Sequence, residues 1–364
     1  MRVPGAARSG GTGPTPDPSN QEETMRLATS LPPRTLALAT PLTLLLALGP
    51  DAAAQTVSVD VRAVVTNVTD DQGVLGGAVS VGQELTGTYL YDLQPPLVET
   101  SPFTSQYTSA GAPSGFTVRA GCGGPVFQSD PAGPELVITI IDLPFPPLDQ
   151  YLAASSANAP LPDGTAVEGI LLALSDSSGA ALSGTDLAAQ PPAPEDFELA
   201  ELLIEGDTPP GLFSVPAFRI EADVTSLELT PPALAAGVES LSIAAGGAQA
   251  LALTADPCAF GGSLYLVLGS LSGTDPGLPL ESVVLPLNPD DYTTFTLTNA
   301  SDGVILVDTL GLLDAQGTAA AAIQVPPWLS PSLAGTVLNH AFLALDGFGS
   351  VGFASNAVEL TLLP

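Results

Sequence analysis

Apolar and polar residues alternate along short segments of this chain, with the period of two that is typical of a β-strand with one buried face. In TVSVDVRAVVTNV, residues 56–68, Val57, Val59 and Val61 are separated by polar residues. The same pattern predicts further strands in the first part of the chain, at residues 76–93, 114–121, 135–143, 167–176 and 217–229.

Two segments depart from a regular strand pattern. In AFRIEADVTSLEL, residues 217–229, the apolar positions from Phe218 to Val224 share one face, and the shift to Leu227 predicts a β-bulge. The segment EDFELAELLIEG, residues 195–206, has the spacing of a short helix, and a strand fits it almost as well. Because its neighbours are all predicted strands, we expect a strand there as well.

A proline pair in LTPPALAAGVES, residues 229–240, interrupts the pattern, and a new series of strands follows it. These strands are predicted at residues 239–245, 249–255, 263–270, 282–287, 293–299, 304–309, 318–326, 337–346 and 357–364. The short, regular spacing is typical of β-sandwiches. We therefore predict an all-β protein of two β-sandwich-like domains in tandem, residues 55–230 and 239–364, joined by a linker at 231–238.

Composition supports a folded chain of many short strands. Hydrophobic residues make up 45% of the sequence and the mean hydropathy is +0.36, so the chain can bury a core despite its acidity. The 37 prolines and 37 glycines break the apolar runs into short blocks, which favours strands and turns over long helices.

The N-terminal region has the pattern of a secretory signal peptide. Arg26 and Arg34 precede the apolar run 36–49, and the small residues 52–54 provide a cleavage site near Ala54. The apolar run is shorter than the roughly 20 residues that a spanning helix needs. We expect residues 1–24 to be an over-extended or structureless leader, residues 25–54 to be a cleaved signal peptide, and the mature chain to be secreted or held at the cell surface without a spanning segment.

The charge balance limits the partners. The formal net charge is −31, the chain has no lysine, and only Arg62, Arg119 and Arg219 remain after the predicted cleavage. Such a chain repels nucleic acids and anionic membranes. A cell-surface glycan or protein is the partner class that the charge allows.

Residues for common catalytic chemistry are scarce. The loop GSLSGTDPGLPL, residues 269–280, lacks the lysine of a phosphate-binding loop and the serine register of a nucleophile elbow, so we interpret it as a connector. His340 is the only histidine, which excludes conventional zinc sites and favours a structural role for its side chain. We interpret Trp328, the only tryptophan, as a core residue that anchors its loop rather than a sugar platform.

The two cysteines lie one in each predicted domain, Cys122 in RAGCGGP and Cys258 in DPCAFGG. Export permits a disulfide between them. Two free thiols are nevertheless the default expectation, because the sequence does not show whether their Cα atoms approach within about 7 Å.

Calcium is the cofactor that best suits this charge, because it binds carboxylate, amide and carbonyl oxygens. Three acidic turn segments, NVTDDQG, NPDDY and NASDG, supply the candidates, although none matches an EF-hand loop and aspartate is also an ordinary turn residue. The candidate ligands are Asp70, Asp71, Asp290, Asp291, Asn299 and Asp302. The other possibility is that the protein has no cofactor.

The second half contains the segments LYLVLGSLSGTDPGLPL at 264–280, PSLAGTVLNHAFLALD at 331–346 and SNAVELTLLP at 355–364. Through such segments it resembles a C-terminal β module that recurs in large secreted proteins of planctomycete-type bacteria. The first half is similar to a looser family of exported bacterial β domains, through VSVGQELTGTYLYD at 79–92 and FRIEADVTSLEL at 218–229. These resemblances imply accessory β modules without an established ligand or catalytic residue.

Together these features predict a secreted, acidic, non-enzymatic protein with a binding, adhesion or structural role at or outside the cell surface. Two alternatives stay open. One is a glycoside hydrolase or lyase that uses two of the many carboxylates, and the other is a spacer without a ligand. An enzyme should bring several carboxylates together in a concave pocket, whereas a binding module should present a flat or edge-strand surface.

Overall fold

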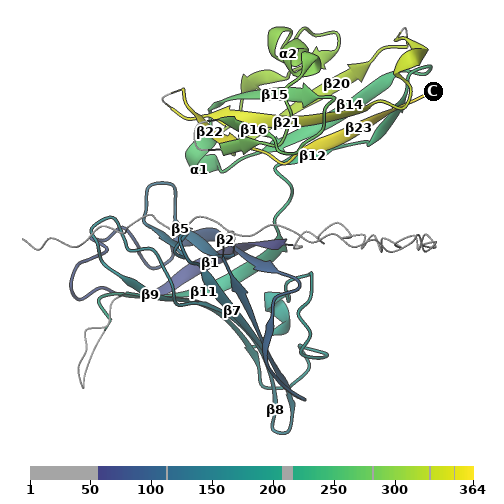
Figure 1. The fold of residues 1–364 in the computed structure, drawn as a ribbon. Coiled ribbons are helices and arrows are strands. Elements are labelled where there is room, and N and C mark those ends of the chain that lie inside the picture. The colour runs from purple at the N-terminus through teal and green to yellow at the C-terminus, as the bar shows by residue number, and fades with distance from the viewer. Residues whose placement is uncertain (1–55, 112–113, 207–215, 281–282, 328, 348) are drawn as a thin grey trace, which may run out of the picture. The chain divides into compact units, whose positions relative to one another are not determined.

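The computed structural model describes residues 56–111, 114–206, 216–280, 283–327, 329–347 and 349–364 (Figure 1). The predicted leader, the signal peptide and Trp328 lie outside these residues. The described chain is all-β, as predicted, with large curled antiparallel sheets. Of the helices in this part of the chain, none has the length and apolarity needed to cross a membrane.

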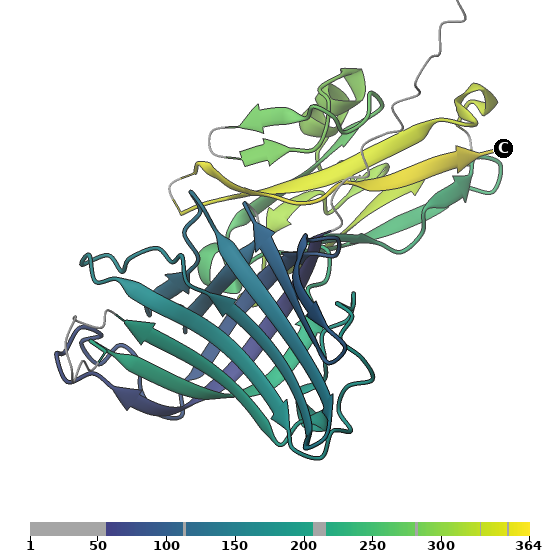
Figure 2. The same cartoon turned by 60° about the horizontal axis from the view of Figure 1, so that its bottom comes forward.

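The first half forms one antiparallel sheet of eleven strands in the order β3-β4-β7-β8-β9-β10-β11-β1-β2-β5-β6. The strands are β1 Thr56–Thr69, β2 Glu84–Asp92, β3 Leu97–Ser101, β4 Thr104–Ala110, β5 Gly115–Ala120, β6 Val126–Gln128, β7 Glu135–Pro144, β8 Pro147–Ser155, β9 Val167–Asp176, β10 Leu199–Gly206 and β11 Arg219–Leu229. Figure 2 shows that this sheet curls around its own inner face.

The curl brings strands that are distant in the sheet order into side-chain contact. Tyr89 on β2 and Tyr151 on β8 place their hydroxyl oxygens 3.2 Å apart, although five positions separate the two strands in the sheet. Phe127 on β6 packs against Phe218, the residue just before β11, with ring centroids 5.8 Å apart. One sheet therefore encloses its core between two opposed portions, which gives the sandwich-like character.

Local details of this sheet agree with the alternation pattern. The pairing of β1 with β11 shifts between Arg62, which faces Ser226, and Ala63, which faces Val224. Thr225 is the extra residue, so the predicted bulge is confirmed. The ambiguous segment 195–206 is a strand from Leu199 onward, preceded by a 3-10 turn at Pro194–Asp196.

The second half contains a four-stranded sheet, β12-β14-β20-β18, and a six-stranded sheet, β13-β23-β21-β15-β19 with β22 beside β21. Its elements are β12 Leu234–Ala236, β13 Ser240–Ser242, β14 Gly247–Thr254, α1 Pro257–Phe260, β15 Leu264–Ser270, β16 Leu278–Leu280, β17 Val283–Leu285, α2 Asp291–Thr298, β18 Leu306–Val307, β19 Leu310–Leu312, β20 Thr318–Val325, a 3-10 turn at Pro331–Leu333, β21 Val337–Leu345, β22 Val351–Ala354 and β23 Val358–Leu363.

The four-stranded and six-stranded sheets share one hydrophobic core. Leu251, Leu253 and Ile323 contribute from the first, and Val267 and Phe342 from the second. A smaller cluster on the other face of the six-stranded sheet packs beneath the β16–β17 hairpin and includes Leu268, Leu285 and Leu343. This arrangement of two sheets around a core is that of a sandwich.

The prediction of a strand at residues 293–299 is wrong, because the chain forms helix α2 there. Asp290 begins the helix: its Oδ1 accepts from the Thr293 N–H at 2.9 Å, and the Asp290 N–H donates to Thr293 Oγ1 at 3.1 Å. This reciprocal capping box satisfies N–H groups that the first helical turn leaves free. It overrides the β-propensity of the threonine-rich segment.

Candidate functional site

A groove of about 820 Å³ lies along one side of the second sandwich, between the edges of its two sheets. Residues from 232–240, including strand β12, form one wall, and residues from 356–361, including the start of β23, form the other. The groove exists because β12 is the edge strand of its sheet and does not pair with β23.

The backbone of β12 faces the groove at every second residue. The Thr254 N–H donates to the Ala233 carbonyl and the Gly237 N–H to the Ala250 carbonyl, so alternation turns Leu234 and Ala236 to the other side. Asn356 binds both backbone groups of Leu234: its Oδ1 accepts from the N–H and its Nδ2 donates to the carbonyl, each at 2.9 Å. Ala236 is the next residue on β12 to present an N–H and a carbonyl toward the groove.

A buried glutamine ties the two walls together. Gln249 on β14 is 0% exposed, and its Nε2 donates to the carbonyls of Val238 and Glu359, both at 2.8 Å. The Thr361 N–H donates to the Glu239 carbonyl at 2.8 Å, which adds a second connection. The separation of the walls is therefore fixed by hydrogen bonds rather than by loop packing alone.

The groove is acidic and otherwise lined by small or apolar side chains. Glu239 and Glu359 are exposed in opposite walls, and neither arginine nor histidine is among the described lining residues. Ala235, Ala236 and Ala357 leave the strand backbones accessible because their side chains are short. An extended chain with basic or neutral side chains fits this surface chemically.

The predicted calcium ligand Asp70 closes a turn. Its Oδ1 accepts from the Val74 N–H at 2.8 Å and its Oδ2 from the Leu75 N–H at 2.9 Å. Its neighbour Asp71 is exposed. These bonds give Asp70 a local structural role. Calcium binding at this turn stays a prediction.

Asp290 also has a structural role beyond the capping box. Its Oδ2 accepts from the N–H groups of Leu271 at 2.6 Å and Ser272 at 2.8 Å, which fixes the loop that begins at residue 271. Partial burial disfavours the charged form, but the hydrogen bonds from Thr293, Leu271, Ser272 and Ser270 outweigh it and lower the pKa of Asp290 to about 2. The neighbouring Asp291 is exposed.

The other two candidates lie at the far end of α2. The Asn299 Nδ2 donates to the Phe295 carbonyl at 2.9 Å, and the Asp302 N–H donates to the Asn299 carbonyl at 3.1 Å. Asp302 Oδ1 accepts from three successive N–H groups, of Val304, Ile305 and Leu306, and these bonds lower its pKa. The six candidates thus lie in three separate turns, two in each. Within the described ranges, no group of three or more His, Cys, Asp or Glu residues is arranged to hold a metal ion.

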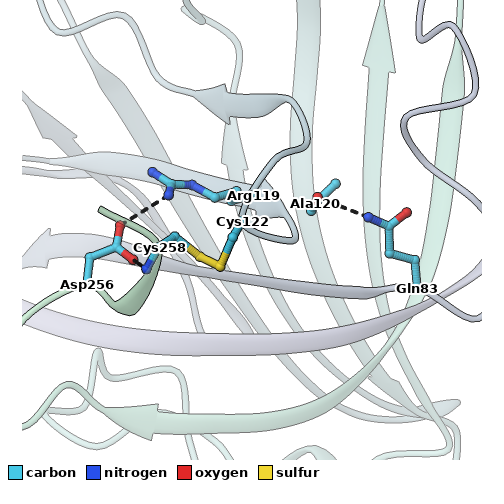
Figure 3. Close-up of a disulfide and its surroundings, with 6 residues drawn as sticks. All are labelled: Gln83, Arg119, Ala120, Cys122, Asp256 and Cys258. Atoms are coloured by element: carbon cyan, nitrogen blue, oxygen red, sulfur yellow. Dashed lines mark hydrogen bonds and ion pairs between the residues drawn. A yellow bond between two sulfur atoms is a disulfide. The ribbon is translucent and has the colours of Figure 1, made fainter. Parts of the chain in front are cut away.

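Cys122 and Cys258, for which the sequence leaves a disulfide and free thiols open, form a disulfide in the structure (Figure 3). Their Cα atoms are 4.7 Å apart and their sulfur atoms 2.11 Å apart. Cys122 follows β5, and Cys258 lies in α1, 136 residues later. The bond therefore joins the eleven-stranded sheet covalently to the second half.

Charged groups flank the disulfide. Arg119 Nη1 lies 3.3 Å from Asp256 Oδ2, and the Cys258 N–H donates to Asp256 Oδ1 at 2.8 Å. Asp256 thus caps α1 and neutralises Arg119 at the same time (Figure 3). On the other side of Cys122, the Gln83 Nε2 donates to the Ala120 carbonyl at 3.0 Å.

His340 lies on β21 inside the second sandwich and is 0% exposed. Its Nε2 is 2.9 Å from the Tyr292 hydroxyl oxygen, and its Nδ1 has no partner among the described residues. Burial lowers the pKa of His340 to about 4, so the ring is neutral at neutral pH. The opposite residue on β15 is Gly269, where a Cβ would clash with the Tyr292 ring. This tight packing fits the structural role predicted for the histidine.

Comparison of the chain with protein-family models and with curated proteins found no match. The class that the fold and the site define is an all-β, sandwich-like protein with an acidic groove along the edge of a sheet.

Proposed function

We propose that this protein is secreted and acts as a non-enzymatic binding protein at or outside the cell surface, holding an extended segment of a partner protein in the groove between β12 and β23. The observation that carries this proposal is the orientation of Ala236, which presents its N–H and carbonyl to the groove. A partner segment that adds to a sheet edge gains main-chain hydrogen bonds from such groups.

The charge of the groove defines the partner further. Glu239 and Glu359 belong to opposite walls, which contain no described basic residue, and the whole chain carries a net charge of −31. Complementarity favours a segment whose alternate side chains are basic. The tandem two-domain layout predicted from the sequence is part of the proposal, with the second domain as the binding module and the first as a companion module joined to it by the disulfide.

A substitution at Ala236 tests this proposal. Proline at residue 236 removes the N–H that faces the groove and leaves the β14 ladder intact, because that ladder uses the residues on either side. We expect an extended (Val-Lys)₃ peptide to bind the protein and to bind A236P at least about tenfold more weakly, as measured by fluorescence anisotropy. Ala236→Ser, which keeps the N–H, is the matched control and should bind like the unaltered protein. Equal binding by A236P would exclude this edge as the site.

The same binding experiment also tests the role of charge, in the peptide and in the groove. A (Val-Glu)₃ peptide should not bind, and the double substitution E239Q/E359Q should reduce the preference for the basic peptide. If neither peptide binds the unaltered protein, the proposal of an extended protein partner is wrong.

A carboxylate-based glycoside hydrolase or lyase is the second candidate, favoured by the presence of Glu239 and Glu359 in one groove. Such an enzyme would release reducing ends from an added polysaccharide, and Glu359→Gln would abolish that release. Absence of cleavage over a panel of neutral and basic polysaccharides would exclude it for those substrates.

A further inference from the structure

Three aspartates lie side by side on the inner face of the eleven-stranded sheet. Asp142 on β7 is directly opposite Asp149 on β8, and Asp149 is directly opposite Asp176 on β9. The residues two positions further into each strand belong to the core: Ile140, Tyr151 and Leu174. The alternation of the strands therefore directs all three carboxylates inward, at the end of this core.

Asp149, the middle residue, is 0% exposed, and Asp176 is 4% exposed. The Leu182 N–H donates to Asp149 Oδ2 at 2.7 Å, whereas Asp149 Oδ1 has no hydrogen-bond partner among the described residues. A buried carboxylate without compensation is strongly unfavourable, and such groups are normally paired with a cation or bound to a metal. Like charges directly opposite one another on neighbouring strands destabilise the fold further.

Within the part of the chain that the structure describes, no side-chain cation lies at this row. The chain has no lysine, and each of the three arginines in the described residues forms ion pairs elsewhere. Arg62 pairs with Glu84, Arg119 with Asp256, and Arg219 with Glu205 and Glu221. No arginine of the described residues therefore compensates Asp149, and a cation from solution could take that place.

The loop that follows β9 covers the row and is held in place by several hydrogen bonds. Asp176 Oδ2 accepts from the Ala180 N–H at 2.9 Å and from the Ser178 hydroxyl at 2.7 Å, and these bonds lower the pKa of Asp176 to about 2. The Tyr91 hydroxyl donates to the Ala188 carbonyl at 2.7 Å, and the Tyr107 hydroxyl donates to the Thr185 carbonyl at 2.9 Å. The loop is thus held against the row by hydrogen bonds to Asp149, Asp176 and two tyrosines.

We propose that Asp149 Oδ1 and the carboxylate of Asp176 bind one Ca²⁺ ion beneath the loop that covers the row. Calcium takes six to eight oxygen ligands, and backbone carbonyls and water commonly supplement few carboxylates. Two carboxylates suffice for this arrangement when carbonyl and water oxygens complete the coordination. Asp142 adds negative charge beside the ion. The carboxylate of Asp176 also accepts from backbone N–H groups, at Oδ1 from Ser178 at 3.0 Å and at Oδ2 from Ala180 at 2.9 Å. The site differs from the turns of Asp70, Asp290 and Asp302 because it contains Asp149 Oδ1, a buried carboxylate oxygen without a partner among the described residues.

Calorimetric titration of the purified full chain with CaCl₂ tests this site, after treatment with chelator and at an ionic strength fixed with NaCl. We expect Ca²⁺ to bind and to raise the Tm relative to chelator, because a ligand that binds only the folded state stabilises it. Asp149→Asn should weaken the affinity about tenfold or more, since the amide nitrogen replaces the unpartnered oxygen. The amide oxygen still accepts from Leu182, so the loop stays attached.

Asp71→Asn is the matched control, because it removes the same charge from an exposed turn. It should leave the affinity unchanged. If Asp149→Asn does not fold by circular dichroism, Asp142→Asn takes its place and should weaken binding at least about threefold through the lost neighbouring charge. The proposal is overturned if the unaltered protein shows no calcium effect beyond matched ionic strength, if Asp149→Asn or its replacement binds as the unaltered protein does, or if Asp71→Asn abolishes binding.

Discussion

At the scale of single residues, burial decides the charge of the one histidine. His340 and Tyr292 share a hydrogen bond inside the second sandwich, and desolvation disfavours the charged form of both, so it lowers the pKa of His340 and raises that of Tyr292. The sequence identified His340 as a structural residue because no partner motif accompanied it. Its hydrogen-bond partner depends on helix α2, which the alternation pattern did not predict.

His340 should make the protein less stable in acid. Its pKa is about 4 in the folded state, against 6.5 for an exposed histidine, so the unfolded chain binds the proton first as the pH falls. Above about pH 6.5, protonation of His340 does not reduce the free energy of unfolding. By pH 4, it has lowered this free energy by about 3 kcal/mol. Urea unfolding between pH 7 and pH 4 should show that His340→Gln loses less stability than the unaltered protein by about this amount.

Tyr292→Phe is the control for this prediction. It removes the hydrogen bond but keeps the buried imidazole, so its stability should still fall between pH 6.5 and pH 4. Parallel pH curves for His340→Gln and the unaltered protein would show that the histidine does not control this loss.

At the scale of elements, the alternation of apolar and polar residues predicted the long strands well. It located β1, β9 and β11, together with the bulge at Thr225, because one face of each strand is buried in a continuous core. The pattern did not predict strand β4, with the sequence TSQYTSA. Its buried positions include Ser105 and Ser109, whose hydroxyls take part in hydrogen bonds. A polar strand of this kind leaves no hydrophobic signal.

Helix α2 was missed for a different reason. Its threonines favour strands by propensity, and its start depends on the reciprocal hydrogen bonds of Asp290 and Thr293. The same aspartate was predicted as a calcium ligand, since a turn aspartate and a metal ligand look alike in sequence. The structure shows that its oxygens accept bonds from both the helix and the loop at 271–272.

Asp290→Ala should therefore destabilise the second half. The substitution removes the cap of α2 and leaves the Leu271 and Ser272 N–H groups without their acceptor, and we expect a loss of about 2 kcal/mol in the free energy of unfolding. Asp291→Ala, one residue later and exposed, is the matched control and should change the stability by only a few tenths of a kcal/mol. Equal effects of the two substitutions in chemical denaturation would contradict the capping role.

At the scale of the whole molecule, the important features join residues that are distant in the sequence. The groove requires the edge of β12 to lie beside residues 356–361, and the aspartate row requires the register of three strands. Neither leaves a motif in the sequence. Composition predicted an acidic surface without local cations, but it did not show that two aspartates would lie buried in one row.

The disulfide is the one long-range link for which the sequence offered both partners. The chain has two cysteines, and trypsin cleavage after Arg119 and Arg219 places Cys122 in fragment 120–219 and Cys258 in fragment 220–364. If the disulfide, whose Cα atoms lie 4.7 Å apart, forms in the purified protein, the two fragments will migrate together after denaturation, alkylation and digestion, and will separate only when a reductant is added. Cys258→Ser should release them without reductant, because only one thiol remains. Separation of the fragments from the unaltered protein before reduction would show that the cysteines are free, and the companion module would then be held by the linker alone.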